Sequence, residues 1–383
     1  MNKLTDFTQK LLQQRSVTGE PDCGAIDLLS QKLESLGFKC KKISFQDDNS
    51  YDVDNLHAIF NPKKSDKILY FAGHTDVVPV GDLNSWKYPP FSAQIEGGII
   101  YARGIVDMKG AISAFVIAIE NFLEKKDIDF GIGFLITGDE EGCAINGTPK
   151  MLKWMKENNY KISHCIVGEP TNPEYVGQMV KVGRRGSMNF ELKLQGKQGH
   201  VAYPHNAENP ITSLINILKI LKDYKLDYGN EFFDPSNLEI TKIFNDDLGT
   251  NVIPDTAYAR FNIRFNDEHS SQKLIDWVKY VLDHSASKYE LNYRVSGESF
   301  LSEDKFLQNL LSKSISKITG KDPILSTTGG TSDARFIKDY SPVIECGLVN
   351  TTAHQIDENI ELSEVQLLKD IYLEVLKNYG EDS

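Results

Sequence analysis

Short, mostly apolar runs alternate with segments of helical periodicity along this chain, and this alternation most constrains its fold. The runs Ile68 to Ala72, Gly131 to Thr137 and Ser163 to Val167 contain no Asp, Glu, Lys or Arg, as expected of strands covered on both faces. Strands that alternate with helices predict an α/β domain with a largely parallel sheet. In such sheets a ligand site lies beyond the carboxyl ends of the strands.

Other segments complete this predicted domain. We expect helices over Leu4 to Gln14, Ile26 to Leu36, Ala111 to Leu123, Thr148 to Glu157, Lys305 to Thr319 and Ser363 to Tyr379, and a short helix after the glycine-rich stretch Thr328 to Asp333. Runs of β-prone residues predict strands over Phe38 to Phe45, Asn55 to Phe60 and Pro342 to Cys346, with a hairpin around Gly97-Gly98. The α/β alternation is therefore found before and after a central part of different character.

The central part, between about Gly183 and Ser296, follows the order strand, helix, strand, strand, helix, strand. The strands are expected over Ser187 to Gln195, Leu238 to Phe244, Thr256 to Phe265 and Leu291 to Val295, and the helices over Asn209 to Leu221 and Ser271 to His284. This βαββαβ order predicts a ferredoxin-like domain inserted in the larger one. We expect residues 1–182 and 296–383 to form one domain and residues 183–295 the other.

Composition excludes several classes of protein. A chain of 383 residues exceeds what one hydrophobic core usually supports, which agrees with two domains. A formal net charge of -12 argues against general affinity for nucleic acids or anionic membranes, and the five cysteines include no C-x-x-C pair. No secretory signal and no membrane-spanning run is visible. We expect a soluble, cytoplasmic protein that binds small molecules or metal ions.

Side chains that can bind a cation follow several of the predicted strands or lie in loops. These residues are His74, Asp76, Asp107, Glu140, Glu141, Glu169 and, much later, His354. Each alone is compatible with an ordinary surface residue or a solvated turn. Together they can meet at one edge of the sheet, where two imidazoles and several carboxylates suit a pair of zinc-like ions with one bridging carboxylate.

The spacing within this set suggests separate roles. Asp76 is two residues after His74, so in an extended strand both side chains point the same way and Asp76 can accept the second ring proton of His74. Glu140 and Glu141 can divide two tasks, one as a ligand and one as a base. A bound ion lowers the pKa of water from roughly 15.7 to about 7, so that a neighbouring carboxylate can take its proton.

Other chemistries find less support. The nearest approach to G-x-S-x-G, Gly330 to Ala334, lacks the last glycine, and neither a Walker A loop nor G-x-G-x-x-G follows any strand. Four further histidines lack a strand-end setting and are expected to be structural: His57, His164, His269 and His284.

Several motifs resemble those of the di-zinc amidohydrolases and exopeptidases, a family that includes aminoacylases, acetylornithine deacetylases and desuccinylases. The motifs shared across the family are Gly73 to Pro79, Gly104 to Gly110, Thr137 to Gly142 and Gly168 to Thr171. More selective motifs resemble the desuccinylase branch: Gly183 to Ser187, Gly199 to His205, Asn251 to Pro254, Gly329 to Phe336 and His354 to Glu358. Cys143 departs from the pattern, since it stands where a proline is expected.

The resemblance implies a ligand set and a fold. It places His74 and Glu169 on one zinc, Glu141 and His354 on the other, and Asp107 between them, followed by a cis peptide bond. Glu140 is then the general base, and Asp76 lies behind His74. Asp139 stays open, as a turn residue or an acceptor behind a ligand. The implied architecture is a zinc-exopeptidase-like α/β/α catalytic domain with two zinc ions per subunit, which cobalt can replace, and an inserted lid and dimerisation domain.

The resemblance also implies a substrate, N-succinyl-LL-2,6-diaminopimelate, hydrolysed to succinate and LL-2,6-diaminopimelate in lysine and diaminopimelate biosynthesis. The implied substrate-binding residues are Arg184, Ser187, Asn251, Arg264, Gly330, Thr331 and Asn350. Arginine forks suit a substrate with several carboxylates. A surface ion pair is an equal alternative for Arg264 and a weaker one for Arg184, which lies in a selective motif. His200 is implied to act in catalysis from the partner subunit of a homodimer. The alternatives are a related acetylornithine deacetylase or metallo-exopeptidase and, from another class, a metal-binding scaffold without turnover.

Overall fold

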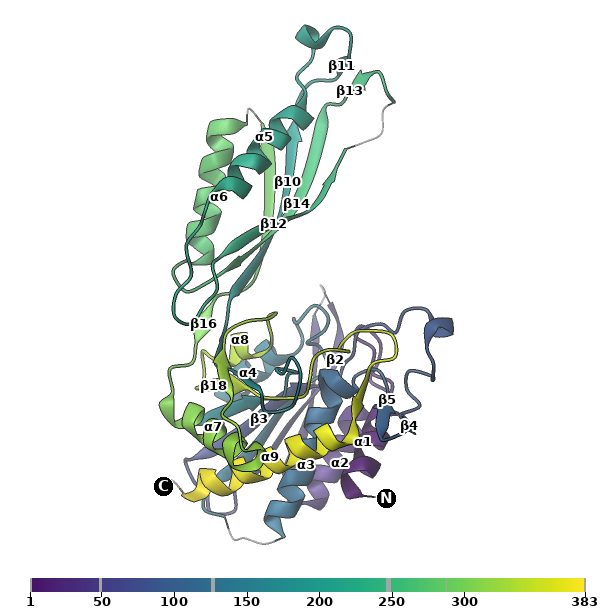
Figure 1. Cartoon of the computed structure of the whole chain (residues 1–383), viewed down its shortest axis with the longest axis vertical. Coiled ribbons are helices and arrows are strands. Elements are labelled where there is room, and N and C mark those ends of the chain that lie inside the picture. The colour runs from purple at the N-terminus through teal and green to yellow at the C-terminus, as the bar shows by residue number, and fades with distance from the viewer. Residues whose placement is uncertain (1, 48–49, 125–127, 246–248, 287, 382–383) are drawn as a thin grey trace. The chain divides into compact units, whose positions relative to one another are not determined.

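The computed structural model describes residues 2–47, 50–124, 128–245, 249–286 and 288–381. The chain forms two compact units (Figure 1). The first unit consists of Met1–Val182, Ser302–Ser326 and Ser332–Ser383. The second unit consists of Gly183–Leu301 and Thr327–Thr331. The second unit thus extends beyond the expected end at residue 295, because β16 (Phe300–Leu301) pairs with β9 (Gly183–Arg184).

The first unit is built on an eight-stranded mixed sheet of order β1-β2-β6-β3-β7-β18-β8-β17. The strands are β1 (Lys39–Asp47), β2 (Ser50–Phe60), β3 (Ile68–His74), β6 (Gly131–Thr137), β7 (His164–Val167), β8 (Met179–Lys181), β17 (Ile324–Ser326) and β18 (Val343–Glu345). The central strands β6, β3, β7 and β18 are parallel, as the sequence predicts. The antiparallel pairs of β2 with β1 and β6 were not predicted. Only two residues separate β1 from β2, too few for the helix of a parallel crossover.

The helices of the first unit confirm the predicted ones, among them α8, the short helix expected after the glycine-rich stretch Thr328 to Asp333. They are α1 (Lys3–Leu12), α2 (Ala25–Ser35), α3 (Gly110–Leu123), α4 (Thr148–Glu157), α7 (Lys305–Thr319), α8 (Ala334–Ile337) and α9 (Leu362–Glu381). Helix α3 is apolar almost all round and packs against α9. The ring of Phe115 on α3 stacks on Phe71 of β3 at 4.5 Å and meets Tyr372 of α9 at 5.2 Å. These rings join β3, α3 and α9 within the core of this unit.

A small three-stranded sheet, of order β19-β5-β4, joins two distant parts of the chain. The predicted hairpin is formed by β4 (Gln94–Glu96) and β5 (Ile99–Tyr101), and β19 (Asn359–Glu361) pairs with β5. A short helical turn, η2 (Ile105–Lys109), follows β5, and its Asp107–Met108 peptide bond is cis, as the resemblance implies. The loop before β19 is thereby held beside the turn that carries Asp107.

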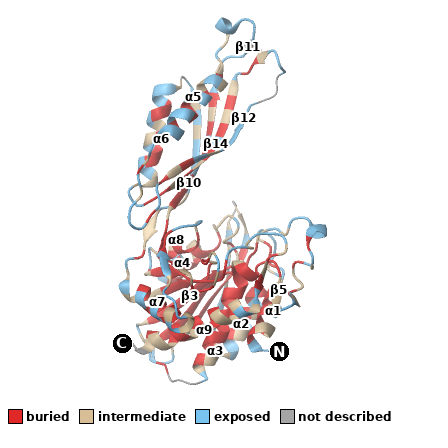
Figure 2. Cartoon of the chain, in the orientation of Figure 1, coloured by how far each residue is buried: buried red, intermediate tan, exposed pale blue. Residues whose placement is uncertain are grey.

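The second unit has the predicted ferredoxin-like order. Its elements are β10 (Gly186–Gln195), α5 (Pro210–Asp223), β12 (Asn237–Phe244), β14 (Thr256–Phe265), α6 (Ser271–Ser285) and β15 (Tyr289–Gly297). The strands form an antiparallel sheet of order β12-β14-β10-β15, and α5 and α6 lie on one side of it (Figure 1). Alternate residues of β10 and β14 are buried against those helices, while the others are more exposed (Figure 2). This alternation gives the unit a core of its own.

Among the described residues, no helix is both long enough and apolar enough to cross a membrane.

Candidate metal centre

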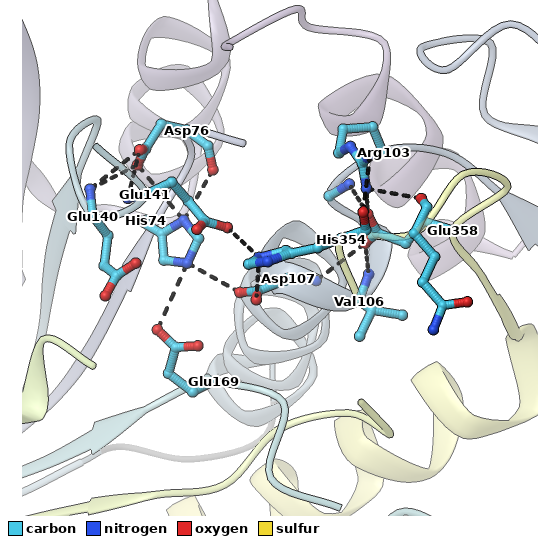
Figure 3. A network of polar contacts seen from close by, with 12 residues as sticks. His74, Asp76, Arg103, Val106, Asp107, Glu140, Glu141, Glu169, His354 and Glu358 are labelled. Carbon is cyan, nitrogen blue, oxygen red and sulfur yellow. Dashed lines mark hydrogen bonds and ion pairs between the residues drawn. The ribbon is translucent and has the colours of Figure 1, made fainter. Parts of the chain in front are cut away.

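The cation-binding side chains of the first unit gather at the carboxyl ends of neighbouring strands (Figure 3). His74 is the last residue of β3, Glu140 and Glu141 follow β6, and Glu169 follows β7. The sheet places β3 between β6 and β7, so these strand ends are adjacent. Parallel strands deliver their carboxyl ends to the same edge of a sheet, which is why residues distant in sequence meet here.

Asp107 lies between the two histidines and presents one carboxylate oxygen to each. The Nε2 atom of His74 lies 3.2 Å from Oδ1 of Asp107, and Nε2 of His354 lies 3.1 Å from its Oδ2. His74 also approaches Glu169, with 3.6 Å between Nε2 and Oε1. His354 approaches Glu141, with 2.8 Å between Nε2 and Oε1. The arrangement has the form of two ligand groups that share Asp107, which is the pairing that the resemblance implies.

These spacings fit the ligands of divalent ions. Tetrahedral zinc sites hold nitrogen and oxygen ligands at about 2.0 to 2.2 Å, which separates neighbouring ligand atoms by about 3.3 to 3.6 Å. The ligand atoms of His74, Asp107 and Glu141 lie within 4.8 Å of one another, and so do those of His74, Glu140 and Glu169. These two sets group the carboxylates differently from the shared-Asp107 arrangement. We favour the latter, because Glu141 directly contacts His354 and Glu169 faces His74.

The pKa shifts of the clustered carboxylates and histidines also indicate a site that binds positive charge. Burial raises the pKa of Glu169 and of Glu140 well above the usual range. Burial opposes charge on Asp107, but hydrogen bonds from His354 and His74 outweigh it and lower its pKa. Hydrogen bonds to carboxylates raise the pKa of His354 to about 10, and the carboxylates overcome burial to raise that of His74 well above its usual range. Protons or metal cations can supply the positive charge that this group of carboxylates demands.

Asp76 differs from its predicted role. The Nδ1 atom of His74 donates to the backbone carbonyl of Asp76 at 2.9 Å, whereas the Asp76 carboxylate lies 3.6 Å away. That carboxylate instead accepts the backbone N–H of Glu140 at 3.1 Å and of Glu141 at 2.9 Å. The physical reason is that β3 ends at His74, so the strand alternation does not continue to Asp76. Asp76 thus fixes the tautomer of His74 through its backbone and the acidic pair through its side chain.

Asp139, which the sequence left open, closes the loop that follows the acidic pair. Its buried carboxylate accepts the hydroxyl of Tyr51 at 2.5 Å and the backbone N–H groups of Ile145 and Asn146 at 2.9 and 3.1 Å. Asp139 is therefore an acceptor inside its own loop. The half-buried Cys143 lies in the same loop.

The predicted substrate-binding residues are divided between the units. Asn350 belongs to the first unit, with the ligand cluster. The second unit contains the other six, Arg184, Ser187, Asn251, Arg264, Gly330 and Thr331.

Within the second unit these residues form two groups. Near β9, Arg184 donates to the carbonyl of Thr328 at 3.1 Å, and Ser187 is paired with Arg264 between β10 and β14. At the opposite end of the unit, the exposed His200 lies in β11 (Gly199–His200), which pairs with β13 (Val252–Ile253) beside Asn251 (Figure 1). His200 and Asn251 therefore form a pair of their own, away from the Arg184 group.

Sequence reasoning assigned no role to three charged residues at the cluster. Arg335 of α8 lies 3.9 Å from Glu140, measured from Nη1 to Oε1. Arg103 and Glu358 form a buried ion pair at 2.8 Å beside Asp107 and His354. Glu358 ends one of the selective motifs, which is the only signal that the sequence offers for it.

An α/β domain that gathers imidazoles and carboxylates at the carboxyl edge of its sheet, and that carries an inserted ferredoxin-like domain, defines a metallohydrolase. This chain belongs to Peptidase family M20/M25/M40, whose family model matches residues 70–378.

Curated relatives cover nearly the whole chain. Two proteins named succinyl-diaminopimelate desuccinylase, from Ehrlichia canis (strain Jake) and Pelagibacter ubique (strain HTCC1062), are 49% and 46% identical to it. The first match covers 97% of both chains and the second 99% of both.

Solved structures at lower identity show the fold. The M20 metallo-carboxypeptidase Sso-CP2 from Sulfolobus solfataricus has a TM-score of 0.80 and 19% identity over 100% of both chains. A Bacillus subtilis protein described as a dinuclear metal binding peptidase from the M20 family has a TM-score of 0.72 and 14% identity, covering 99% of this chain and 98% of its own.

Proposed function

We propose that this chain hydrolyses the amide bond of N-succinyl-LL-2,6-diaminopimelate to yield succinate and LL-2,6-diaminopimelate, a step of lysine and diaminopimelate biosynthesis. Curated relatives at 45 to 49% identity carry the name of that activity. The observation that carries the chemistry is the position of Asp107, whose two oxygens each face a different histidine. Such a carboxylate suits two cations held side by side.

The residues that would hold two ions are present as two groups. His74, Asp107 and Glu169 form what we call the first metal position, and Asp107, Glu141 and His354 form the second. We propose zinc, with cobalt as a substitute, because nitrogen and oxygen ligands suit both ions. When bound, the ions act as Lewis acids and make water acidic enough to lose a proton near neutral pH.

Glu140 is the proposed general base. Its side chain is 11% exposed and lies beside the proposed ligands, where it can exchange a proton with a bound water. It takes a proton from the attacking water and passes it to the nitrogen of the leaving amine. The Asp76 carboxylate fixes the backbone of Glu140, which keeps the base in place during both transfers.

Substrate recognition is proposed to use the residues that the resemblance implies. Arg184 and Arg264 offer guanidinium forks that match carboxylates, and Ser187 lies beside Arg264 in the sheet. Gly330 and Thr331 would add backbone donors, and Asn350 would act from the first unit. The substrate carries several carboxylates, so an otherwise acidic protein needs such a cationic group to bind it.

The second unit is proposed to act as a lid and as the dimerisation domain of a cytoplasmic homodimer. His200 is exposed and lies with Asn251 at the end of its unit remote from Arg184, which suits a residue that serves another subunit (Figure 1). In the partner subunit, His200 would polarise the scissile carbonyl of the substrate. Mixing a His200→Ala protein with a Glu140→Gln protein should restore activity if the subunits exchange. Lack of recovery in verified mixed dimers would contradict action across the dimer.

A substrate panel tests the proposed function. The zinc-loaded protein should hydrolyse N-succinyl-LL-2,6-diaminopimelate with a kcat/KM at least about 100-fold above that for acetylornithine or a dipeptide, because each charge-assisted contact contributes about 1.5 to 3 kcal/mol. A preference for acetylornithine or peptides would instead assign a sister activity of the family. Absence of turnover on every substrate with both ions bound would favour the scaffold alternative.

A further inference from the structure

We infer that Arg103 and Glu358 are positioning residues that clamp the turn carrying Asp107 to the loop carrying His354, and thereby build the second metal position. The inference rests on the metal centre of the proposed function, but not on the identity of its substrate. It gives a role to the buried ion pair between Arg103 and Glu358, the last residue of the His354 to Glu358 motif.

Glu358 holds the turn before Asp107 through its side chain. Its Oε2 atom accepts the N–H of Gly104 at 3.0 Å, and its Oε1 atom accepts those of Val106 at 2.9 Å and Asp107 at 3.3 Å (Figure 3). Arg103 adds a fourth donor, with 2.8 Å between its Nη1 atom and Oε2. A fully buried carboxylate is thus surrounded by donors, three of which belong to the backbone that leads into Asp107.

Arg103 holds the loop that carries His354. Its guanidinium donates to the carbonyl of Gln355 at 3.0 Å and approaches that of His354 at 3.4 Å, while it also pairs with Glu358. The side chain is 3% exposed and lies over the ring of Trp86 at 5.1 Å. One guanidinium therefore links the Glu358 carboxylate with the backbone of the His354 loop, a task that requires its several fixed donors.

The backbone of His354 needs such support. Its φ of 63° lies in the left-handed region, which residues other than glycine adopt uncommonly. The pairing of β19 with β5 and the hydrogen bond from Ala102 N–H to the carbonyl of Glu358, at 3.0 Å, fasten the far end of the loop. The Arg103 contacts fasten the histidine end.

The first metal position shares Asp107 with the second but takes neither of its other ligands from the clamped segments, so loss of the clamp should weaken it less. Its own ligands, His74 and Glu169, are placed by strands β3 and β7 of the main sheet. The second position takes both Asp107 and His354 from the clamped segments. Residues that orient metal ligands typically contribute about 10- to 100-fold in metal affinity.

A metal titration of Glu358→Gln tests the inference. In the wild type both carboxylate oxygens of Glu358 accept hydrogen bonds from N–H groups. The glutamine amide would place an NH₂ group, itself a donor, against some of these N–H groups. We expect one of two zinc equivalents to bind about 10- to 100-fold more weakly, and the other to change less than about 3-fold. Competition with a chromophoric chelator measures both constants on the full-length apo protein. A His354→Ala protein identifies the affected position, because it lacks a ligand of the second position and keeps the first. Adding Glu358→Gln to His354→Ala should therefore leave the affinity of the first position nearly unchanged.

Two further variants make the result decisive. Arg103→Lys keeps the charge but cannot span Glu358 and both carbonyls, so it should weaken the same position. Glu374→Gln is the matched control, because Glu374 is a buried carboxylate of the first unit that pairs with Lys317 and Lys377. It should bind both equivalents like the wild type. Circular dichroism of each apo protein shows whether it is folded, and Arg103→Lys gives the decision if Glu358→Gln does not fold.

Wild-type affinities at both positions in a folded Glu358→Gln or Arg103→Lys protein would overturn the inference. Equal losses at both positions would do so as well, because they would show general damage. The titration contains no substrate, so a protein that failed to cleave N-succinyl-LL-2,6-diaminopimelate would disprove the proposed function and leave this result unaffected.

Discussion

The interior of the eight-stranded sheet and its carboxyl edge each bury a histidine, and the two histidines lie in opposite electrostatic environments. His57 of β2 contacts the hydroxyl of Tyr70 at 3.0 Å and the rings of Trp154 and Tyr160, and burial lowers its pKa to about 4. His74 of β3 is equally buried but meets carboxylates, and its pKa is raised. Burial therefore does not distinguish a structural histidine from a functional one. Position at a strand end, next to side chains from other strand ends, does.

The carboxyl edge can be tested first at its proposed base, where the largest effect is expected. Glu140→Gln should lower kcat by about 10³- to 10⁴-fold, because the amide cannot take a proton from water. Both metal equivalents should remain, since Glu141 supplies the ligand. Metal content by elemental analysis, measured beside the kinetics, separates the two roles. Loss of metal with activity retained would contradict the assignment of Glu140 as base.

A second comparison sets the two buried histidines against each other. His74→Gln should lower kcat/KM by about 100- to 1000-fold and weaken metal binding, because the first position loses its only imidazole. His57→Gln should keep kcat/KM within about 3-fold, since His57 lies in the interior of the sheet. Kinetics and chelator competition on both proteins provide the check. Similar losses of activity in the two variants would remove the distinction between edge and interior.

Most residues at the carboxyl edge of the main sheet could be predicted from sequence, because strands covered on both faces have a distinctive apolar pattern. The runs that become β3, β6 and β7 are continuous and apolar, so their ends, and with them His74, Glu140 and Glu169, could be placed. Strands β8, β17 and β19 were missed, since each has three residues and owes its pairing to partners far along the chain. Local sequence carries little information on such contacts.

The contacts behind the ligands were less predictable than the ligands themselves. The side-chain direction of Asp76 depends on where β3 ends, and an error of one residue reverses it. Arg103 and Glu358 are a buried pair, yet charged residues in loops are mostly exposed, so sequence alone favours the wrong environment. Their partners are largely backbone groups, which leave no mark in the side-chain pattern.

Asp76→Asn sharpens the distinction between the two roles of this residue. The backbone carbonyl that accepts from His74 remains, whereas the side chain loses one acceptor oxygen for the N–H groups of Glu140 and Glu141. We expect kcat to fall about 10- to 100-fold, with weaker binding at the second metal position and nearly unchanged binding at the first. Chelator competition again resolves the positions. A loss confined to the first position would instead support the predicted contact between the Asp76 carboxylate and His74.

The smallest effect concerns the interior histidine and the pH dependence of stability. The pKa of His57 is about 4 in the folded chain and about 6.5 when unfolded, so between these values the unfolded chain binds more protons. Stability therefore rises with pH across this window and is lost as pH falls through it. From pH 6.5 to pH 5.0 the His57 contribution to the free energy of unfolding should fall by about 1.5 kcal/mol.

Urea unfolding of the apo proteins at pH 6.5 and 5.0 measures this contribution, as the difference between wild type and His57→Gln. The variant should lose less stability on acidification than the wild type, because glutamine does not titrate. His284→Gln on α6 is the matched substitution at an exposed histidine outside the sheet interior. An identical pH dependence in wild type and His57→Gln would mean that the interior of the sheet accommodates a charged imidazole. Only His74 and its carboxylates would then distinguish the edge from the interior.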